Sequence, residues 1–133
     1  MASQENFYNG TIRTFVAQAA ITKNYPVELH TTANNVNVIG AASDVVIGIA
    51  LDTVSAGANI KVLMAGPTKI MVSAAAVTKG TYVALSGTAG KVAAVTLSGS
   101  GTTLQYVIGI ALEAASAIDE EIEVLWMPFV YQI

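Results

Sequence analysis

The chain has 133 residues, enough for one domain with its own core, and only 11% of them are charged. The net charge of −3, with six Lys and Arg residues that form no cluster, excludes a basic surface for nucleic acid. Cysteine is absent, which excludes disulfides and thiolate metal sites, and no apolar stretch approaches the roughly 20 residues of a membrane-spanning helix.

Short segments rich in Val, Ile, Thr and Tyr follow one another along the chain, separated by Gly, Asn, Ser and Pro. This pattern predicts an all-β fold without an amphipathic helix. Residues 1–14 are polar and lack periodicity, so we expect an extended N-terminal arm there and a single β domain over 15–133. The expected strands are 11–17, 26–31, 35–39, 45–51, 59–65, 69–73, 81–86, 91–96, 104–112 and 121–127, with a last extended piece at 129–133 that closes an edge.

Four positions carry signals about the backbone. Asn24 and Gly80 stand in tight connections and suit a positive φ. Gly48 and Gly109 interrupt the most apolar segments, and glycine within a strand marks a bulge or a close approach of two backbones. These segments are apolar throughout and are expected to be central strands with both faces buried: 45–51 and 107–112.

The chain contains an internal repeat, because 46–52 (VIGIALD) returns 61 residues later as 107–113 (VIGIALE). Shorter matches surround it, at 15–23 with 71–79 and at 60–63 with 122–125. Units of this size do not easily bury a core alone. We therefore expect two repeated β units, about 15–66 and 71–128, packed into one shared core as a compact barrel or sandwich.

No group of side chains points to an active site. His30 is the only histidine and is expected to be a half-exposed strand residue, since a lone histidine is weak evidence for metal. The acidic residues of 119–123 lack the glycine of a calcium loop and predict a solvated turn. Asp52 and Glu113, at equivalent ends of the central strands, are expected to cap turns. With neither a nucleophile motif nor a phosphate loop, the sequence predicts no enzyme, no metal and no cofactor.

The charge-poor composition bears on partners. Hydrophobic residues make up 53% of the chain, and interface cores are depleted in charge, so we expect part of the surface to lie against other subunits. A surface rich in Ala, Ser, Thr and Gly is the alternative explanation. The N-terminus has no basic region followed by an apolar core, so no signal peptide is expected.

Three segments form a recognisable combination: 107–115 (VIGIALEAA) followed by an acidic turn and an alternating strand, 77–83 (VTKGTYV), and 87–92 (GTAGKV). Together they resemble the small capsid cement, or decoration, proteins of tailed bacteriophages. The resemblance implies a non-enzymatic virion protein, made in the host cytoplasm, that sits on the outside of an icosahedral head. It further implies a homo-oligomer, commonly a trimer, that bridges major capsid subunits. The termini are the expected contact regions, with these candidate residues: Phe7, Tyr8, Ile12, Arg13, Phe129 and Tyr131.

The sequence departs from the family pattern at its turns and at its end. Family members often carry Gly-Asp at the turns, whereas 79–81 (KGT) lacks the Asp and 23–26 (KNYP) lacks both, and the tail at 127–133 runs past the usual end. These differences leave the docking mode open. The alternative function is a β-rich binding or adhesion module, such as a tail or fibre domain that recognises a surface glycan. Its nearest candidate residues are Tyr25, Asn34 and Asn35.

Overall fold

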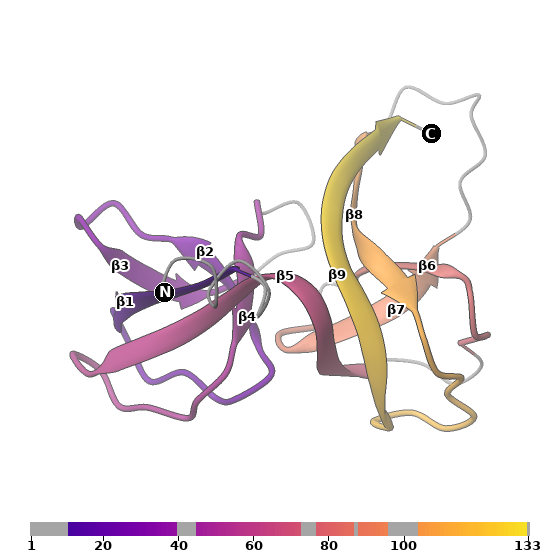
Figure 1. The fold of residues 1–133 in the computed structure, drawn as a ribbon, viewed down its shortest axis with the longest axis horizontal. Helices are drawn as coiled ribbons and strands as arrows, with labels where there is room; N and C mark the ends of the chain where they lie inside the picture. The colour runs from indigo at the N-terminus through magenta and orange to yellow at the C-terminus, as the bar shows by residue number, and fades with distance from the viewer. Residues whose placement is uncertain (1–10, 40–44, 73–76, 87, 96–103, 133) are drawn as a thin grey trace, which may run out of the picture.

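The computed structural model describes residues 11–39, 45–72, 77–86, 88–95 and 104–132, and the regular structure within them is all β-strand. The prediction of an all-β fold is confirmed. The strands are β1 (Thr11–Ala17), β2 (Pro26–Leu29), β3 (Asn35–Val38), β4 (Gly48–Ala50), β5 (Asn59–Val72), β6 (Tyr82–Leu85), β7 (Lys91–Val95), β8 (Leu104–Ala111) and β9 (Glu121–Gln132) (Figure 1).

The strands form two closed barrels that share β5. β1, β3, β2, β4 and β5 are neighbours in that order, and β1 also pairs with β5, which closes a five-stranded circuit. β5, β7, β6, β8 and β9 follow in turn, and the pairing of β9 with β5 closes a second circuit. We call the first circuit, with residues 59–65 of β5, the N-terminal barrel and the second, with residues 66–72, the C-terminal barrel. They lie side by side in Figure 1, joined by β5.

The two barrels have the same order and direction of strand pairing. β1 runs parallel to β3, as β5 runs parallel to β7. The other pairings are antiparallel in both barrels. The isolated bridge between Ile21 and Val54 also has a counterpart, between Val77 and Ala115.

The pairing corrects one alignment made from the sequence. The match of 15–23 with 71–79 makes Met71 the counterpart of Phe15. In the structure Phe15 pairs with Ile60, and the residue that pairs with Ile122 is Ile70, so Ile70 takes the place of Phe15. An ungapped match cannot show this shift, because the segment between this strand and the next turn differs in length by one residue between the halves.

The buried side chains form two clusters rather than the one shared core expected from the sequence. The first lies within the N-terminal barrel and comprises Phe15, Ala17, Ile21, Val27, Val36, Ala50, Ile60 and Val62. The second fills the C-terminal barrel and also takes in four residues of the N-terminal half: Ile39, Val46, Ile49 and Leu63. Each fully buried Val or Ile contributes about 1.5–3 kcal/mol. The second cluster therefore stabilises the contact between the barrels as well as one barrel interior.

Strand β5 is continuous, although the sequence predicts separate strands at 59–65 and 69–73. Gly66, with a φ of 110°, bends the chain where it passes from one barrel to the other. β4 pairs with β5 only as far as Leu63, and β7 joins it only at Met71. β1 pairs with β5 as far as Ala65, so at Pro67 the paired strand is β9, and Pro67 can lack its N–H without breaking a second ladder.

Strand β9 is likewise continuous through Pro128, where the sequence predicts a break between 121–127 and 129–133. β9 pairs with β5 only as far as Trp126, and its register with β8 shifts between Trp126 and Phe129. Proline is tolerated at such a bulge because a ladder hydrogen bond is already missing there. A Gly-Pro or Met-Pro pair therefore looks like a turn in sequence while lying inside a strand.

The backbone signals read from single residues are confirmed. Asn24 and Gly80 have φ values of 69° and 89°. A Cβ added to Gly48 would lie 2.4 Å from the Leu63 carbonyl oxygen, and one added to Gly109 would lie 1.8 Å from that of Leu125.

The expectation of two doubly buried central strands is correct in part. Gly48, Ile49 and Ala50 are all buried, so β4 has both faces covered, but β4 is limited to these three residues and Val45 is 62% exposed. In β8, Val107, Ile108 and Ala111 are buried while Ile110 is partly exposed. A run of apolar residues in sequence therefore overstates how much of each segment is covered.

Candidate functional site

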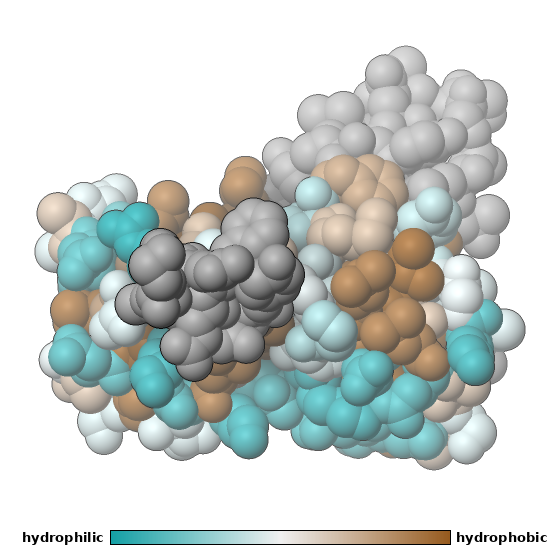
Figure 2. All heavy atoms as spheres, viewed as in Figure 1, coloured by the Kyte–Doolittle hydropathy of each residue, from teal (hydrophilic) through white to brown (hydrophobic). Residues whose placement is uncertain are grey.

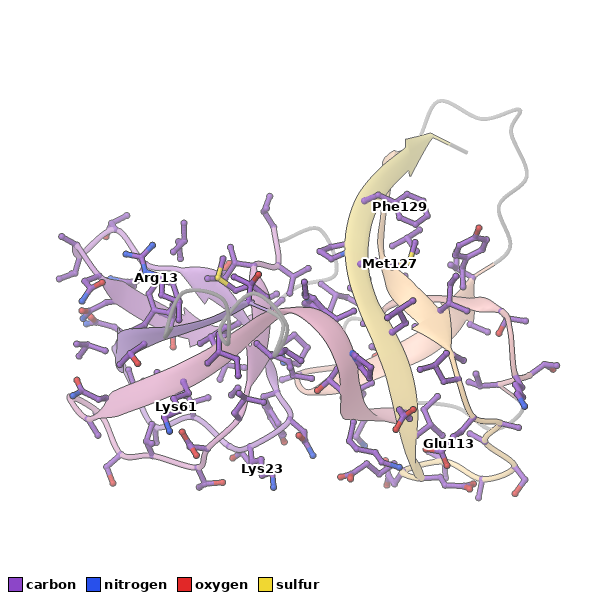
Figure 3. The ribbon with its side chains drawn as sticks, viewed as in Figure 1. Arg13, Lys23, Lys61, Glu113, Met127 and Phe129 are labelled. Carbon is purple, nitrogen blue, oxygen red and sulfur yellow. The ribbon has the colours of Figure 1, made fainter. Side chains whose placement is uncertain are left out.

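Lys23, Lys61 and Glu113 lie apart from the apolar side chains of Met127 and Phe129 (Figure 3). The three charged residues lie toward the lower edge of the view in Figure 3, where Figure 2 shows a band of hydrophilic residues under both barrels. Met127 and Phe129 lie on the upper part of the C-terminal barrel. The first group belongs to a polar edge of the molecule and the second to an apolar face.

The polar edge contains the two predicted turn caps, and both are confirmed. An Asp52 carboxylate oxygen accepts a hydrogen bond from the Lys61 backbone N–H at 3.4 Å. In the C-terminal barrel Glu113 Oε1 accepts one from the Glu123 N–H at 2.9 Å. These acidic side chains hold the loop after the fourth strand of each barrel against the start of the fifth.

Glu113 also forms an ion pair that its counterpart does not have. Lys69 Nζ lies 2.6 Å from Glu113 Oε1, while the residue of β1 that takes the place of Lys69 is Thr14. The hydrogen bond from Lys69, with that from the Glu123 N–H, holds the pKa of Glu113 below its ordinary value. The same hydrogen bond raises the pKa of Lys69. Both side chains are about half exposed, so the pair contributes little to stability.

The acidic turn at 119–123 is engaged within the protein. Glu120 Oε2 accepts hydrogen bonds from the backbone N–H groups of Ser116 and Ala117, at 3.0 and 3.2 Å. Asp119 pairs with Lys91. Among the described residues no three His, Asp or Glu side chains come together as metal ligands do. The prediction of an exposed acidic turn agrees with these contacts and with the exposure of Asp119, Glu120 and Glu121.

His30 is half-buried, as expected, but it lies just after the end of β2 rather than within the strand. Its Nδ1 accepts a hydrogen bond from the Thr32 N–H at 3.0 Å. Ser86 holds the equivalent place after β6, and its hydroxyl accepts from the Thr88 N–H at 3.2 Å. The single histidine of the chain is therefore a turn residue whose role a serine fills in the other barrel.

Two of the predicted capsid-contact residues lie in β1, at positions that the sequence assigned to the arm. Thr11–Thr14 pair with β5 as part of the N-terminal barrel, so the expected arm of 1–14 overlaps a barrel strand in its last four residues. Ile12 is 47% exposed. The Arg13 guanidinium lies 4.7 Å from the centre of the Phe15 ring and donates to Asn34 Oδ1 at 3.5 Å, which holds it to the barrel.

Two more of the predicted contact residues, Phe129 and Tyr131, lie in β9. Phe129 is half-buried and stacks edge-to-face on Tyr82, with ring centroids 5.7 Å apart. Tyr131 pairs through its backbone with Gln105. Phe7 and Tyr8 lie outside the described residues. The sequence analysis missed Met127, which is 39% exposed beside Phe129 (Figure 3).

The two candidate contact regions, on β1 and on β9, meet at one place on β5. Thr11 pairs with Ala65, and Trp126 pairs with the adjacent Gly66. The start of β1 and the point where β9 separates from β5 are therefore neighbours, between the barrels. No signal in the sequence links the two termini, because their proximity depends on both pairing with the same strand.

The residues of the alternative glycan site take part in contacts within the protein. A Cβ on Gly90 would lie within 2.5 Å of the Tyr25 ring, so one ring face is covered by the backbone of the other barrel. Asn35 Nδ2 donates to Gln18 Oε1 at 2.6 Å, and Asn34 accepts from Arg13. Tyr25 thus belongs to the contact between the barrels, together with the hydrogen bond from Asn24 Nδ2 to Glu121 Oε2 at 3.2 Å.

No curated protein matches the chain, and in its described part no helix is long and apolar enough to cross a membrane. A family model described as phage cement protein matches residues 8–126. The matched span takes in β1 to β8 and the part of β9 that pairs with β5, and it ends at Trp126. The chain belongs to the phage cement protein family.

Proposed function

We propose that the protein binds the outside of an icosahedral phage capsid and holds neighbouring major capsid subunits together without covalent bonds. The match to the phage cement protein family over residues 8–126 carries this proposal. The partner is the major capsid protein and the location is the outer surface of the virion, reached after synthesis in the host cytoplasm. The role is structural and includes no catalytic step.

The contact between the barrels supports a bridging role. β5 runs through both barrels, and Ile49 and Leu63 of the first belong to the buried cluster of the second. A body held in this way loses little conformational entropy when it docks across two subunits. A ligand that binds only the assembled lattice stabilises it by mass action. Assembly of the protein as a homo-oligomer, with a trimer favoured, multiplies weak contacts through their effective concentration.

The proposed contact residues are those on β1 and β9, together with the residues that precede β1: Phe7, Tyr8, Ile12, Arg13, Phe129 and Tyr131. Support comes from the exposure of Ile12 and from the pairing of Thr11 and Trp126 with adjacent residues of β5, Ala65 and Gly66. Residues of β1 and β9 can therefore contribute to one contact surface.

Binding to capsids that lack the protein tests the proposal. Purified wild-type protein should co-sediment with empty heads of the cognate phage and raise the temperature at which filled heads release DNA, measured with a DNA-binding dye. A variant lacking residues 1–10 should bind more weakly while keeping its circular dichroism and melting temperature. The deletion stops at residue 10, since removal of 11–14 would also remove barrel pairing. Absence of wild-type binding would refute the proposal.

A matched pair of substitutions tests the contact surface. Ile12→Glu places a charge at a proposed contact, whereas Ile118→Glu places one at an equally apolar, 62% exposed side chain beside the acidic turn. We expect at least tenfold weaker capsid binding for Ile12→Glu, typical of an interface residue, and wild-type binding for Ile118→Glu. Equal effects of the two substitutions would remove Ile12 from the contact surface.

A further inference from the structure

Each barrel presents one row of side chains on its outer face, built from residues directly opposite one another on adjacent strands. Such residues share a face of the sheet. The row of the N-terminal barrel, which we call the N-terminal row, is Pro26, Ile49, Leu63 and Ile12. The row that occupies the same places in the C-terminal barrel, the C-terminal row, is Tyr82, Ile110, Leu125 and Pro67.

The two rows differ in what covers them. Ile49 and Leu63 are 0% and 6% exposed, and both belong to the cluster that fills the C-terminal barrel. Their counterparts Ile110 and Leu125 are partly exposed. Figure 2 shows hydrophobic side chains gathered on this barrel, around the places where Figure 3 labels Met127 and Phe129. The C-terminal row is therefore a partly exposed apolar surface, whereas in the equivalent row Ile49 and Leu63 are buried against the other barrel and Ile12, at its end, is exposed.

The other side of the contact between the barrels also has an exposed equivalent, and that equivalent lies on the N-terminal barrel. Leu85, which pairs with Val92, is buried in the cluster that joins the barrels. Its counterpart Leu29, which pairs with Val36, is 61% exposed.

Gly90 shows the same asymmetry. Gly90 approaches the Tyr25 ring of the N-terminal barrel, while its counterpart Asn34 is exposed. The side of the C-terminal barrel that meets the N-terminal barrel thus has an equivalent on the N-terminal barrel. On that equivalent side, Leu29 and Asn34 are exposed.

We propose that a second copy of this chain docks its N-terminal barrel, through the end that carries Leu29, onto the C-terminal row. The contact would repeat between two chains the contact that already exists between the two barrels of one chain. One half of the interface lies on each end of the molecule, so the association is head-to-tail rather than two-fold symmetric. Repetition of a head-to-tail contact closes into a ring when the rotation permits.

Size-exclusion chromatography with light scattering on the full chain tests the proposal. Leu29→Glu damages one half of the interface and Leu125→Glu the other, and each should weaken self-association at least tenfold. Ile118→Glu is the control, because Ile118 is 62% exposed and lies outside both halves. Circular dichroism and melting temperature report whether each variant is folded. Since Leu125 is partly buried, Met127→Glu, at a more exposed side chain, repeats the test if Leu125→Glu unfolds.

Mixing the two variants gives the sharpest result. The Leu29→Glu copy keeps an intact C-terminal row, and the Leu125→Glu copy keeps an intact Leu29. Only a head-to-tail interface allows these two monomeric variants to form a 1:1 pair. Absence of that pair, a wild-type protein that stays monomeric at 100 micromolar or so, or variants that assemble as wild type does would each overturn the proposal.

Discussion

The two barrels share one pattern of strand pairing, yet the same position is core in one and surface in the other. Ile49 is fully buried because the C-terminal barrel lies over it, whereas Ile110, at the same place in the second barrel, remains partly exposed. The reverse holds for Leu29 and Leu85. Backbone pairing therefore fixes which face of the sheet a side chain occupies, and the neighbouring barrel decides whether that face is buried or exposed to solvent.

The largest expected difference is between Ile49→Ala and Ile110→Ala. Truncation at a fully buried position loses transfer free energy and leaves a cavity, at a cost of about 2–5 kcal/mol. We expect that cost for Ile49 and about 1 kcal/mol or less for the partly exposed Ile110 in dilute protein. Urea unfolding monitored by Trp126 fluorescence gives both free energies of unfolding. Equal costs would contradict the difference in burial between the rows.

The next largest loss of stability is expected for alanine substitutions at the two glycines that lie within strands. Gly48→Ala and Gly109→Ala each drive a methyl group into the carbonyl of the facing strand, and the approach is closer at Gly109. Overpacking of this kind costs about 1–3 kcal/mol, and we expect Gly109→Ala to lie at or above the top of that range. Thermal unfolding of both variants checks the order. A greater loss at Gly48 would mean that β8 and β9 separate more readily than β4 and β5.

A comparison of two turn glycines separates the contribution of the contact between the barrels from that of backbone strain. Gly80 and Gly90 have φ values of 89° and 78°, so alanine at either costs about 1 kcal/mol in backbone strain. Only Gly90 lies against the Tyr25 ring, while nothing lies near a Cβ at Gly80. We expect Gly90→Ala to cost about 1 kcal/mol more than Gly80→Ala in chemical unfolding. Tyr25→Ala in the Gly90→Ala background should abolish that excess.

The smallest expected effect concerns the ion pair of the C-terminal barrel. The pKa of Glu113 lies below its ordinary value of 4.5. Its contacts therefore stabilise the fold above the pKa of the unfolded state, and this contribution is lost as the pH falls through the lowered value. Glu113→Gln should make stability between pH 5 and about pH 3 less sensitive to acid.

Lys69→Met serves as the control for that experiment, because Lys69 is the first cause of the lowered pKa of Glu113. It should produce a similar flattening, and salt should reduce the effect in the wild type. The pH dependence of stability is measured from the melting temperatures of the two variants and their double mutant across this pH range. Acid profiles parallel to that of the wild type would show that the pair does not couple to folding.

Much of the fold is visible in sequence because it depends on local chemistry. Strand composition, the positive φ of Asn24 and Gly80, and the close approaches at Gly48 and Gly109 follow from residues that have few alternatives in those places. The capping roles of Asp52 and Glu113 follow from their position at the end of a strand. The candidate contact residues came from the family resemblance, which the family match confirms at the level of the family alone.

Other features depend on partners that lie far away in the sequence. Gly66 and Pro67 look like a turn, and only the pairing of β9 to β5 shows that they lie inside a strand that crosses between barrels. The meeting of the β1 and β9 segments at Ala65 and Gly66 likewise requires a shared strand.

The sequence by itself determined an all-β chain with paired motifs, few charges and no grouped reactive side chains. The tertiary structure alone decided that β5 belongs to two barrels, and that Ile49 and Leu63 of the N-terminal row are buried while Ile110 and Leu125 of the C-terminal row are partly exposed. The physical reason is that side-chain period and turn chemistry act over a few residues, whereas burial depends on which surface comes to lie against which.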